Sequence, residues 1–411
     1  MESVGVNRNP VGNGARDVGR LGMKAVSMLL ISDTYPPVVG GSEIEAQRVS
    51  AEMIRRGHRV LVLTSGGSPM PPVRDWVDAA GVPVQILTRS ERGRWKDIVF
   101  ACRVAWALWR ERRNYQIVYF LMQGLHLAAG LPVAHALAKP IVMKFGGSGV
   151  IPLMRHSRAG RVELGWLRRW AARLLILNDG MLQEAMADGF PRDQMLWMPN
   201  PVDTDEFRPA KPEEIASLRT GFGIAPGALV AVYVGRLSHE KGLPSLLSGF
   251  ALAAREEPHS MLVLVGDGAM RNELETMATK LGLGPSQVLF SGRVDVSEVP
   301  RWLQASDVFT LTSPREGFSC ALAEAMSVGL ASVVSRIPAN VQLIDDQVHG
   351  LLTPVDDDSA MASALIRLFH DPALRGRMGQ AARQRIIDNY STGQVTERYE
   401  ALFAQVLGGR R

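Results

Sequence analysis

The sequence has few of the features that mark secreted, disulfide-rich or membrane-spanning chains. Its 411 residues include only two cysteines, Cys102 and Cys320, far apart and outside any metal-ligand spacing, which favours a reducing cytosol. No uncharged apolar run is long enough to cross a bilayer. Residues 1–22 are rich in Gly, Asn and Arg without an apolar core, so we predict no signal peptide. These absences together predict a cytoplasmic protein.

What is present is an ordinary globular composition with a mild excess of positive charge. Hydrophobic residues make up 46% and charged residues 21% of the chain, and 46 Lys and Arg against 41 Asp and Glu give a net charge of +5. This length supports two domains with full cores. Such weak basicity suits an anionic ligand or an anionic membrane surface, and it does not by itself indicate nucleic acid.

The first half opens with a strand–helix–strand pattern. Residues 25–31 are a continuous apolar run, typical of a parallel strand buried on both faces. A helix is predicted from Gly40 and Gly41 to Arg55, and residues 60–63 form the next strand, so we expect a doubly wound sheet. The turn is not the dinucleotide-binding G-x-G-x-x-G. Two adjacent glycines at a helix start let a backbone approach a phosphate, although a plain loop-to-helix turn would look the same.

The second half restarts the same kind of winding. Residues 198–207 are rich in Pro and Asx and are predicted to link the two halves. The strand at residues 229–234 then runs into a Gly-Arg-x4-Lys-Gly turn that opens a helix. Arg236 and Lys241 in this turn form a cationic pair beside a strand end, which suits a diphosphate leaving group. Two exposed loop cations are the alternative.

Residues 313–326 carry the densest set of candidate binding groups. They follow the apolar run 307–312 and continue at helical spacing, so strand, turn and helix are predicted. Ser319 is expected to cap the helix. The backbone N–H groups of Gly317, Phe318 and Ser319 would then be free at a helix start, which is a ready site for a diphosphate.

Two carboxylates give this anion site its specificity. Glu316 lies in the predicted turn and Glu324 inside the helix, a spacing that does not suit an acid/base pair flanking one bond. It suits a ligand laid along the helix, with each carboxylate accepting hydrogen bonds from vicinal hydroxyls. A sugar–diphosphate–ribose ligand offers hydroxyls, phosphates and hydroxyls in that order. A capped surface helix with one acid near its positive end is the plain alternative.

The pattern Glu316-x7-Glu324 followed by Ala-Met resembles the E-x7-E pattern of the retaining GT-B-type enzymes of glycosyltransferase family four. The resemblance extends over most of the chain from about Lys24. It implies an α/β protein of GT-B architecture, with two Rossmann-like, doubly wound domains facing a central cleft. By resemblance, Glu316 approaches the donor sugar and Glu324 holds the ribose. The remaining predicted donor-binding residues are Gly40, Gly41, Arg293, Val294, Gly317, Phe318 and Ser319.

Composition and the resemblance together divide the chain into four predicted segments. These are a disordered tail at 1–23, an N-terminal acceptor domain at 24–203, a C-terminal nucleotide-sugar donor domain at 204–388, and a helix at 389–411 that crosses back onto the first domain. The implied reaction is retaining transfer of a hexose from a nucleotide-diphosphate sugar to a hydroxyl of a glycan or glycolipid acceptor. Such transfer would serve cell-surface polysaccharide or glycoconjugate synthesis at the inner face of the cytoplasmic membrane. In the family, retention is explained by same-face attack without a protein nucleophile.

The acceptor side of the first half departs from the family pattern. Many relatives carry a histidine just after the strand at residues 117–122, beside the reacting sugar. Here Gln123 falls nearest that position and His126 lies three residues later, and both are candidate catalytic residues with Arg236, Lys241 and Glu316. Where family members often have a His-Gly pair, Lys144 is the charged residue.

Two stretches combine basic and aromatic residues. The first lies within residues 89–113, and the second spans residues 155–173 with Glu163 as its one acid. Helices with Trp beside Arg suit the interface of an anionic membrane. Solvated helices whose tryptophans serve the core are the alternative. No nucleic-acid-binding motif accompanies the charge, so no nucleic-acid partner is predicted.

The sequence also bears on metal binding and on two alternative functions. The sequence is interpreted as lacking the Asp-x-Asp pair that is typical of metal-bound sugar nucleotides, so neither a metal nor a cofactor is predicted, and Arg236 and Lys241 would supply the positive charge. Two rival functions fit the fold. One is a nucleotide-sugar epimerase, for which the catalytic acids have no evident place. The other is a non-catalytic sugar-nucleotide-binding subunit, which the missing histidine leaves open.

Overall fold

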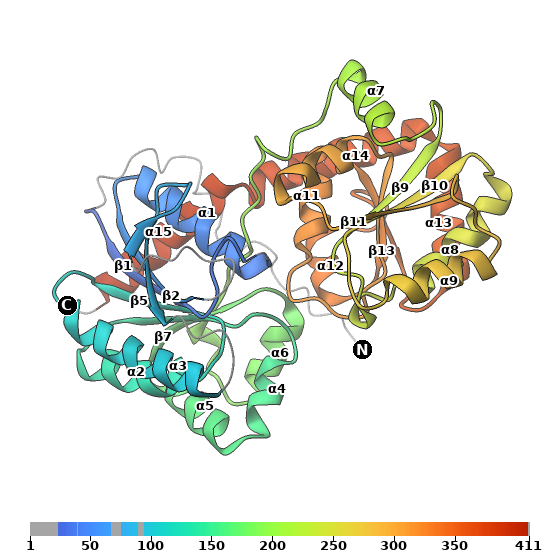
Figure 1. Ribbon diagram of the computed structural model, residues 1–411. Helices are drawn as coiled ribbons and strands as arrows, with labels where there is room; N and C mark the ends of the chain where they lie inside the picture. The colour runs from blue at the N-terminus through green and yellow to red at the C-terminus, as the bar shows by residue number, and fades with distance from the viewer. Residues whose placement is uncertain (1–23, 39, 67–74, 89–93, 410–411) are drawn as a thin grey trace.

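The computed structural model describes residues 24–38, 40–66, 75–88 and 94–409. The predicted tail at 1–23 and Arg92 of the first basic stretch lie outside these ranges. The chain folds into two α/β halves, each with a sheet covered by helices on both faces (Figure 1). In the described part of the chain, no helix combines the length and the apolar character that crossing a bilayer requires.

Within the described ranges, the first half holds an eight-stranded sheet in the order β3-β4-β2-β1-β5-β6-β7-β8. Strand β3 pairs antiparallel with β4, and the other pairs are parallel. The strands are β1 Ser27–Ser32, β2 Arg59–Ser65, β3 Asp75–Val77, β4 Pro83–Thr88, β5 Ile117–Leu121, β6 Ile141–Lys144, β7 Ala171–Ile176 and β8 Met195–Trp197.

Helices cover both faces of this sheet. They are α1 Gly41–Arg55, α2 Arg94–Arg110, α3 His126–Ala136, α4 Val150–Arg155, α5 Arg158–Trp170, α6 Asp179–Ala187, the 3-10 turn η2 Arg192–Gln194, and the C-terminal α15 Thr392–Gly408. Strand β1 shows why both faces are apolar: Met28 and Leu30 pack with α1 and α15, while Leu29 and Ile31 pack with α2 and α3 (Figure 1). A continuous apolar run is the expected sequence of such a strand.

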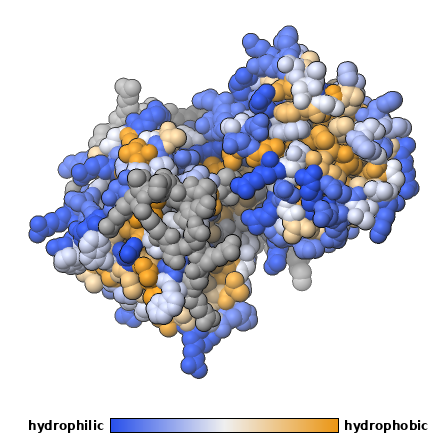
Figure 2. All heavy atoms as spheres, in the orientation of Figure 1, coloured by the Kyte–Doolittle hydropathy of each residue, from blue (hydrophilic) through white to orange (hydrophobic). Residues whose placement is uncertain are grey.

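In the second half, the described strands form a parallel sheet in the order β11-β10-β9-β12-β13-β14. The strands are β9 Leu229–Val234, β10 Ser260–Val265, β11 Val288–Gly292, β12 Val308–Leu311, β13 Ala331–Ser335 and β14 Leu351–Thr353. On the face shown in Figure 2, apolar residues gather around these strands and hydrophilic residues dominate the outer rim.

Helices α8, α9 and α13 pack together on one face of this sheet, and α10, α11 and α14 pack together on the other (Figure 1). The bounds are α7 Pro212–Gly221, η3 His239–Lys241, α8 Leu243–Glu256, α9 Arg271–Lys280, η4 Val296–Glu298, α10 Val299–Gln304, α11 Cys320–Val328, α12 Pro338–Leu343, α13 Asp358–His370 and α14 Pro372–Asn389.

Each sheet reverses its strand order at one point, between β1 and β5 in the first half and between β9 and β12 in the second. Ligands of doubly wound sheets bind outside the carboxyl ends of the strands at such a switch point. The predicted pair of doubly wound α/β domains is therefore confirmed. The loops after β9 and β12 hold Arg236, Lys241 and Glu316 at the switch point of the second half.

The chain crosses between the halves twice, and the two crossings are bonded side by side. Val202 N–H donates to Tyr390 O at 2.8 Å, and Thr392 N–H donates to Val202 O at 3.0 Å. After the second crossing, α15 lies beside α1 on the first half (Figure 1). Its Tyr399 hydroxyl donates to Glu45 Oε1 on α1 at 2.8 Å.

Candidate functional site

The loop at residues 312–319 joins β12 to α11, a helix of nine residues. Among the described residues, no partner accepts the backbone N–H of Gly317, Phe318 or Ser319. Ser319 stands at the N-cap position, but its Oγ donates to Asn340 Oδ1 at 2.5 Å and does not cap α11. The expectation of a capping Ser319 was wrong because α12 brings another acceptor within reach. The free N–H groups can bind an anion.

Glu316 is held beside these N–H groups by Lys241. Lys241 Nζ donates to Glu316 Oε1 at 2.7 Å, and the two side chains are largely buried. Gly242 makes this approach possible: its φ is +64°, and a Cβ there would lie 2.4 Å from Thr312 O. Arg236 shares the loop, but its side chain is 74% exposed and 4.0 Å from Glu240. Lys241 and Glu316 are therefore brought together, while Arg236 extends into solvent.

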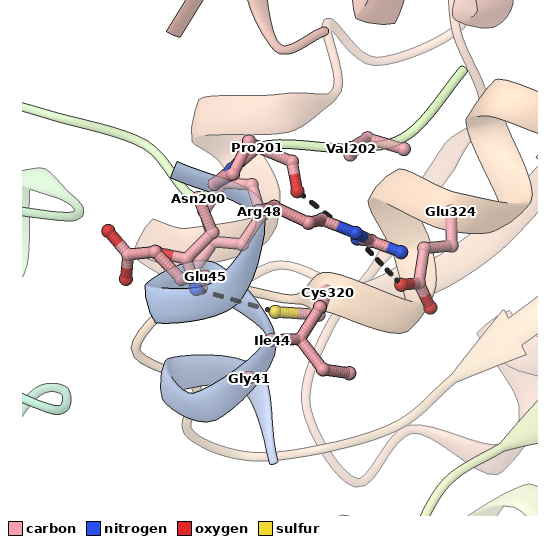
Figure 3. Close-up of a pocket in the computed structure, with 10 residues that line it drawn as sticks. Gly41, Ile44, Glu45, Arg48, Asn200, Pro201, Val202, Cys320 and Glu324 are labelled. Atoms are coloured by element: carbon pink, nitrogen blue, oxygen red, sulfur yellow. Dashed lines mark hydrogen bonds and ion pairs between the residues drawn. The ribbon is translucent and has the colours of Figure 1, made fainter. Parts of the chain in front are cut away.

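Glu324 lies on α11 and faces Arg48 of α1 across the boundary between the halves (Figure 3). Arg48 Nη1 is 3.5 Å from Glu324 Oε1, and both side chains are 13% exposed. Arg48 Nη2 also lies 3.1 Å from Glu206 Oε2. Burial raises the pKa of the Glu324 carboxyl to about 7, and the guanidinium of Arg48 opposes this rise. Glu324 is thus the acid of a largely buried ion pair that joins the halves.

This ion pair borders a small pocket between the two halves (Figure 3). The pocket has room for about one water molecule. Its walls come from α1, the linker and the start of α11, namely Gly41, Ile44, Glu45, Arg48, Asn200, Pro201, Val202, Phe318, Cys320 and Glu324.

Glycines let the backbones of the two halves meet. A Cβ on Gly317 would lie 2.6 Å from Gly147 Cα, and a Cβ on Gly41 would lie 2.9 Å from Cys320 Sγ. Such distances are shorter than packed atoms tolerate. A Cβ on Gly40 would likewise lie 2.3 Å from the Glu43 carboxylate. In this structure, Gly40 and Gly41 therefore serve contacts within the protein.

Two polar side chains of the first half hold the loop that carries Glu316. Asn178 Nδ2 donates to Gly317 O at 2.7 Å, and Ser148 Oγ donates to Glu316 O at 3.4 Å. Asn178 follows β7 and is 1% exposed. Its Oδ1 accepts the N–H of Met181 at 3.0 Å and so caps α6. The sequence analysis missed both residues.

Lys144 is buried inside the first half and is not exposed to solvent. It is 1% exposed, and its Nζ donates to Glu45 Oε1 at 2.5 Å and to Asn200 Oδ1 at 2.9 Å. Burial lowers the pKa of Lys144, while the Glu45 carboxylate raises it. Tyr399 completes the cluster by donating to the same Glu45 oxygen. Lys144 is therefore a buried structural cation that ties α1, the linker and α15 together.

Comparison with known proteins matches both halves separately. Residues 39–206 match the family described as Glycosyltransferase Family 4, and residues 215–385 match Glycosyl transferases group 1. The chain is a glycosyltransferase. Its fold is that of GT-B structures such as Anabaena HepE in complex with UDP and glucose, with a TM-score of 0.78 at 20% identity, covering 92% of this chain and 100% of that chain.

Two curated relatives of the glycosyltransferase differ in how much of each chain is matched. It is 25% identical to alpha-monoglucosyldiacylglycerol synthase of Streptococcus pneumoniae over 349 residues, which are 81% of this chain and 76% of that protein. It is 30% identical over 214 residues to the Escherichia coli UDP-Gal:alpha-D-GlcNAc-diphosphoundecaprenol alpha-1,3-galactosyltransferase, covering 51% of this chain and 54% of that protein. The second match thus spans about half of each protein.

The structure distinguishes the two acceptor-side candidates of the glycosyltransferase. His126 is buried against Phe100 and Phe120, and burial lowers its pKa to about 4, so it is neutral at pH 7. Gln123 Oε1 instead accepts the N–H of Gly146 at 3.4 Å, next to the glycine that meets Gly317. The preceding Met122 has φ +69°, a strained conformation of the kind that clusters at functional sites. Gln123 is thus nearer the loop of Glu316 than the buried His126 by these contacts.

The residues predicted to read the base lie at another strand end of the second half. Arg293 and Val294 follow β11, directly after Gly292, whose φ is +72°. Arg293 is exposed, and Val294 packs partly against the core. Among the described residues, no backbone partner accepts the N–H of either residue.

The two basic and aromatic stretches differ in how far their tryptophans are buried. Trp166 and Trp170 on α5 are half-buried, stack on one another with centroids 5.3 Å apart, and Trp170 also stacks on His135. This second stretch follows the core alternative. On α2, by contrast, Trp95, Trp106 and Trp109 are 78%, 48% and 54% exposed.

Asp-x-Asp spacings do occur in the chain, contrary to the sequence argument about metal. Asp203 and Asp205 lie in the linker, where Asp203 Oδ1 accepts the N–H groups of Asp205 and Glu206. In the second case, Asp356–Asp358, the middle Asp357 caps α13. Among the described residues, no three His, Cys, Asp or Glu side chains are grouped to hold a metal ion.

Proposed function

We propose that this glycosyltransferase moves a hexose from a nucleotide-diphosphate sugar to a hydroxyl of a glycan or glycolipid, with retention at the anomeric carbon. The observation that carries the proposal is the meeting of free N–H groups, Lys241 and Glu316 at one switch point. N–H groups and an ammonium suit the diphosphate, and a carboxylate suits sugar hydroxyls.

Known proteins support the classes of donor and acceptor. The HepE structure contains UDP and glucose. One curated relative is named as a synthase of a glucosyl diacylglycerol, and the other as a transferase that uses UDP-Gal and a diphosphoundecaprenol acceptor. A glycolipid or lipid-linked glycan made in glycoconjugate synthesis is therefore the acceptor class that we assign.

In this proposal, charge on the leaving diphosphate is stabilised by the amides before α11 and by Lys241 and Arg236. Lys241 has three N–H donors and gives one to Glu316 in the structure, so others remain for a phosphate oxygen. Charge grows on the diphosphate as the glycosidic bond breaks, and fixed donors strengthen with it. No metal ion or protein nucleophile takes part. As the bond between the anomeric carbon and the diphosphate breaks, the acceptor hydroxyl attacks from the same face and its proton passes to the leaving diphosphate.

Two rival functions, an epimerase and a non-catalytic binding subunit, are distinguished from the transferase by the products formed from the donor. An epimerase would release free epimerised sugar without an acceptor, whereas a non-catalytic subunit would bind the donor and never hydrolyse it. Slow donor hydrolysis by the pure protein, without epimerised sugar, supports the transferase. A thermal-shift panel of nucleotide sugars identifies the donor, because a ligand that binds only the folded state raises apparent stability.

The decisive experiment separates Glu316 from Glu324. If Glu324 holds the ribose, Glu324→Gln should weaken binding of the free nucleoside diphosphate by about 10- to 100-fold. The reason is that a hydrogen bond from a ribose hydroxyl to a charged group contributes about 1.5–3 kcal/mol. Glu316→Gln should leave that affinity unchanged or improved, since Lys241 is released, but should lower the single-turnover rate. Calorimetry measures the affinity of each variant for the nucleoside diphosphate, and single-turnover kinetics measures its rate. The exposed Glu273→Gln is the control for both measurements. Loss of nucleotide affinity in Glu316→Gln, with retention in Glu324→Gln, would reverse the assignment.

We further propose that α2 rests on the anionic inner face of the cytoplasmic membrane, where a lipid-linked acceptor is available. Trp95, Trp106 and Trp109 recur at helical spacing on its exposed side, and Lys96 on the helix and Arg113 in the turn after it add positive charge. Amphipathic aromatic rings and cations suit that interface.

Vesicle flotation tests this placement. Wild type should float with anionic vesicles, less so as salt rises, and Trp106→Ala/Trp109→Ala should float at least fivefold less. Arg367→Ala/Arg377→Ala removes two exposed cations of the second half and serves as the control. Equal recovery of wild type with neutral and anionic vesicles would leave α2 as a solvated helix.

A further inference from the structure

Two side chains of the first half donate hydrogen bonds to two successive backbone carbonyl groups of the second half. Ser148 Oγ donates to Glu316 O, and Asn178 Nδ2 donates to Gly317 O. The two side chains also contact each other, with Asn178 Nδ2 3.2 Å from Ser148 Oγ. The orientation of the Asn178 amide is determined, because its oxygen accepts the N–H of Met181 and its nitrogen must then face Gly317.

Holding these carbonyls also aims the neighbouring N–H groups. A trans peptide is planar, so its C=O and N–H point in opposite directions. The carbonyl of Glu316 shares a peptide plane with the N–H of Gly317, and the carbonyl of Gly317 shares one with the N–H of Phe318. Both N–H groups lack a partner among the described residues. They are therefore directed away from Ser148 and Asn178 by contacts made across the boundary.

The surroundings leave the loop little freedom to turn away. Gly317 is so close to Gly147 that a Cβ on either residue would press on the other backbone. Asn178 is 1% exposed, so few water molecules compete for its bond to Gly317. A hydrogen bond from a buried neutral donor at 2.7 Å is a firm constraint on one peptide plane.

We infer that Asn178 and Ser148 are positioning residues for the diphosphate, acting through the peptide groups that they hold. The inference rests on the proposed function, in which these amides bind the phosphates. The amide site of the second half is completed by the first half, so that the β-phosphate is bound best when the two halves are in contact.

The test compares diphosphate with monophosphate binding by calorimetry, using UDP against UMP and GDP against GMP. Asn178→Ser is the informative variant because serine also caps a helix, as asparagine does, but is too short to reach Gly317. Ser148→Ala leaves α6 untouched and gives a second result. Asn272→Ser, on an exposed position of α9, is the matched control.

For a pair that binds wild type, Asn178→Ser should lower the preference for the diphosphate about tenfold, with the monophosphate affinity within twofold of wild type. Ser148→Ala should lower it about threefold, and Asn272→Ser should leave it unchanged. Equal weakening of both nucleotides, or an unchanged preference in both variants, overturns the inference while the proposed function stands. Failure of wild type to bind any nucleoside diphosphate, including those of adenine and thymine, overturns the proposed function itself.

Discussion

Replacing Arg48 with methionine removes the cation that faces Glu324 across the boundary between the halves. The two groups are 3.5 Å apart and each is 13% exposed. Methionine keeps the length and apolar stem of the side chain, so the lost charge dominates the effect. Arg48 also contacts Pro201 O and Glu206, which adds neutral and exposed hydrogen bonds to the loss.

The magnitude follows from the separation. At 3.5 Å and an effective dielectric constant of about 20, the Coulomb attraction is about 4–5 kcal/mol. Desolvation of both ions offsets part of it, which leaves a coupling of about 2–3 kcal/mol between Arg48 and ionised Glu324. With Glu324 protonated, the coupling falls to the roughly 1 kcal/mol of an ordinary hydrogen bond.

The pH dependence has a definite sign. The folded-state pKa of Glu324 is raised to about 7, above the 4.5 of a free Glu, so stability falls as pH rises from about 4.5 to 7 in wild type. Arg48 opposes the rise in pKa, so its removal raises the pKa further and extends this loss above pH 7. Arg48→Met should therefore be more destabilising at pH 8.5 than at pH 5.5.

A double-mutant cycle of Arg48→Met and Glu324→Gln measures the coupling by urea-induced unfolding at both pH values. Arg55→Met, at an exposed position on the same helix, is the control and should leave the free energy of unfolding close to that of wild type at both pH values. A coupling below about 0.5 kcal/mol at pH 8.5, or the same coupling at both pH values, would refute the assignment of a largely buried ion pair with a raised pKa.

Three further predictions concern the need for metal, the buried Lys144 and the close approach at Gly317. Transfer should survive excess chelator, and complete loss restored by magnesium or manganese would contradict the cationic role of Arg236 and Lys241. Lys144→Met should lower the free energy of unfolding by about 3–5 kcal/mol because Glu45 is left buried without its cation, and stability equal to wild type would disprove that pairing. Gly317→Ala should lower transfer at least tenfold and raise the radius of gyration in solution scattering, whereas Gly284→Ala, which has open space around it, should change neither.

Much of the fold was accessible from local patterns. The apolar run at residues 25–31 predicted β1, and the glycines before the first helix predicted the start of α1. Gly57, with φ +89°, lies just after that helix, where glycine adopts the left-handed conformation without strain. Local chemistry failed at Ser319, whose hydroxyl bonds Asn340 of a later helix, because a capping preference says nothing about competing partners.

The tryptophans show a second limit of local patterns, namely that they do not predict which side of a helix is buried. Helical spacing predicts which residues share one side of a helix, but it does not say which side another element covers. Trp170 on α5 is stacked against His135 of α3, while Trp106 on α2 is 48% exposed. The basic and aromatic composition was alike in both stretches, and packing separated them.

The sequence by itself determined the two doubly wound domains, because strand and helix periods and glycine turns are local properties of the chain. It also placed Lys241 and Glu316 at strand ends, and strand ends of one parallel sheet meet at one edge. The tertiary structure decided the contacts between the halves: Arg48 with Glu324, and Asn178 with Gly317. These partners are 276 and 139 residues apart. Their pairing depends on how two complete domains dock, a relation that no local pattern encodes.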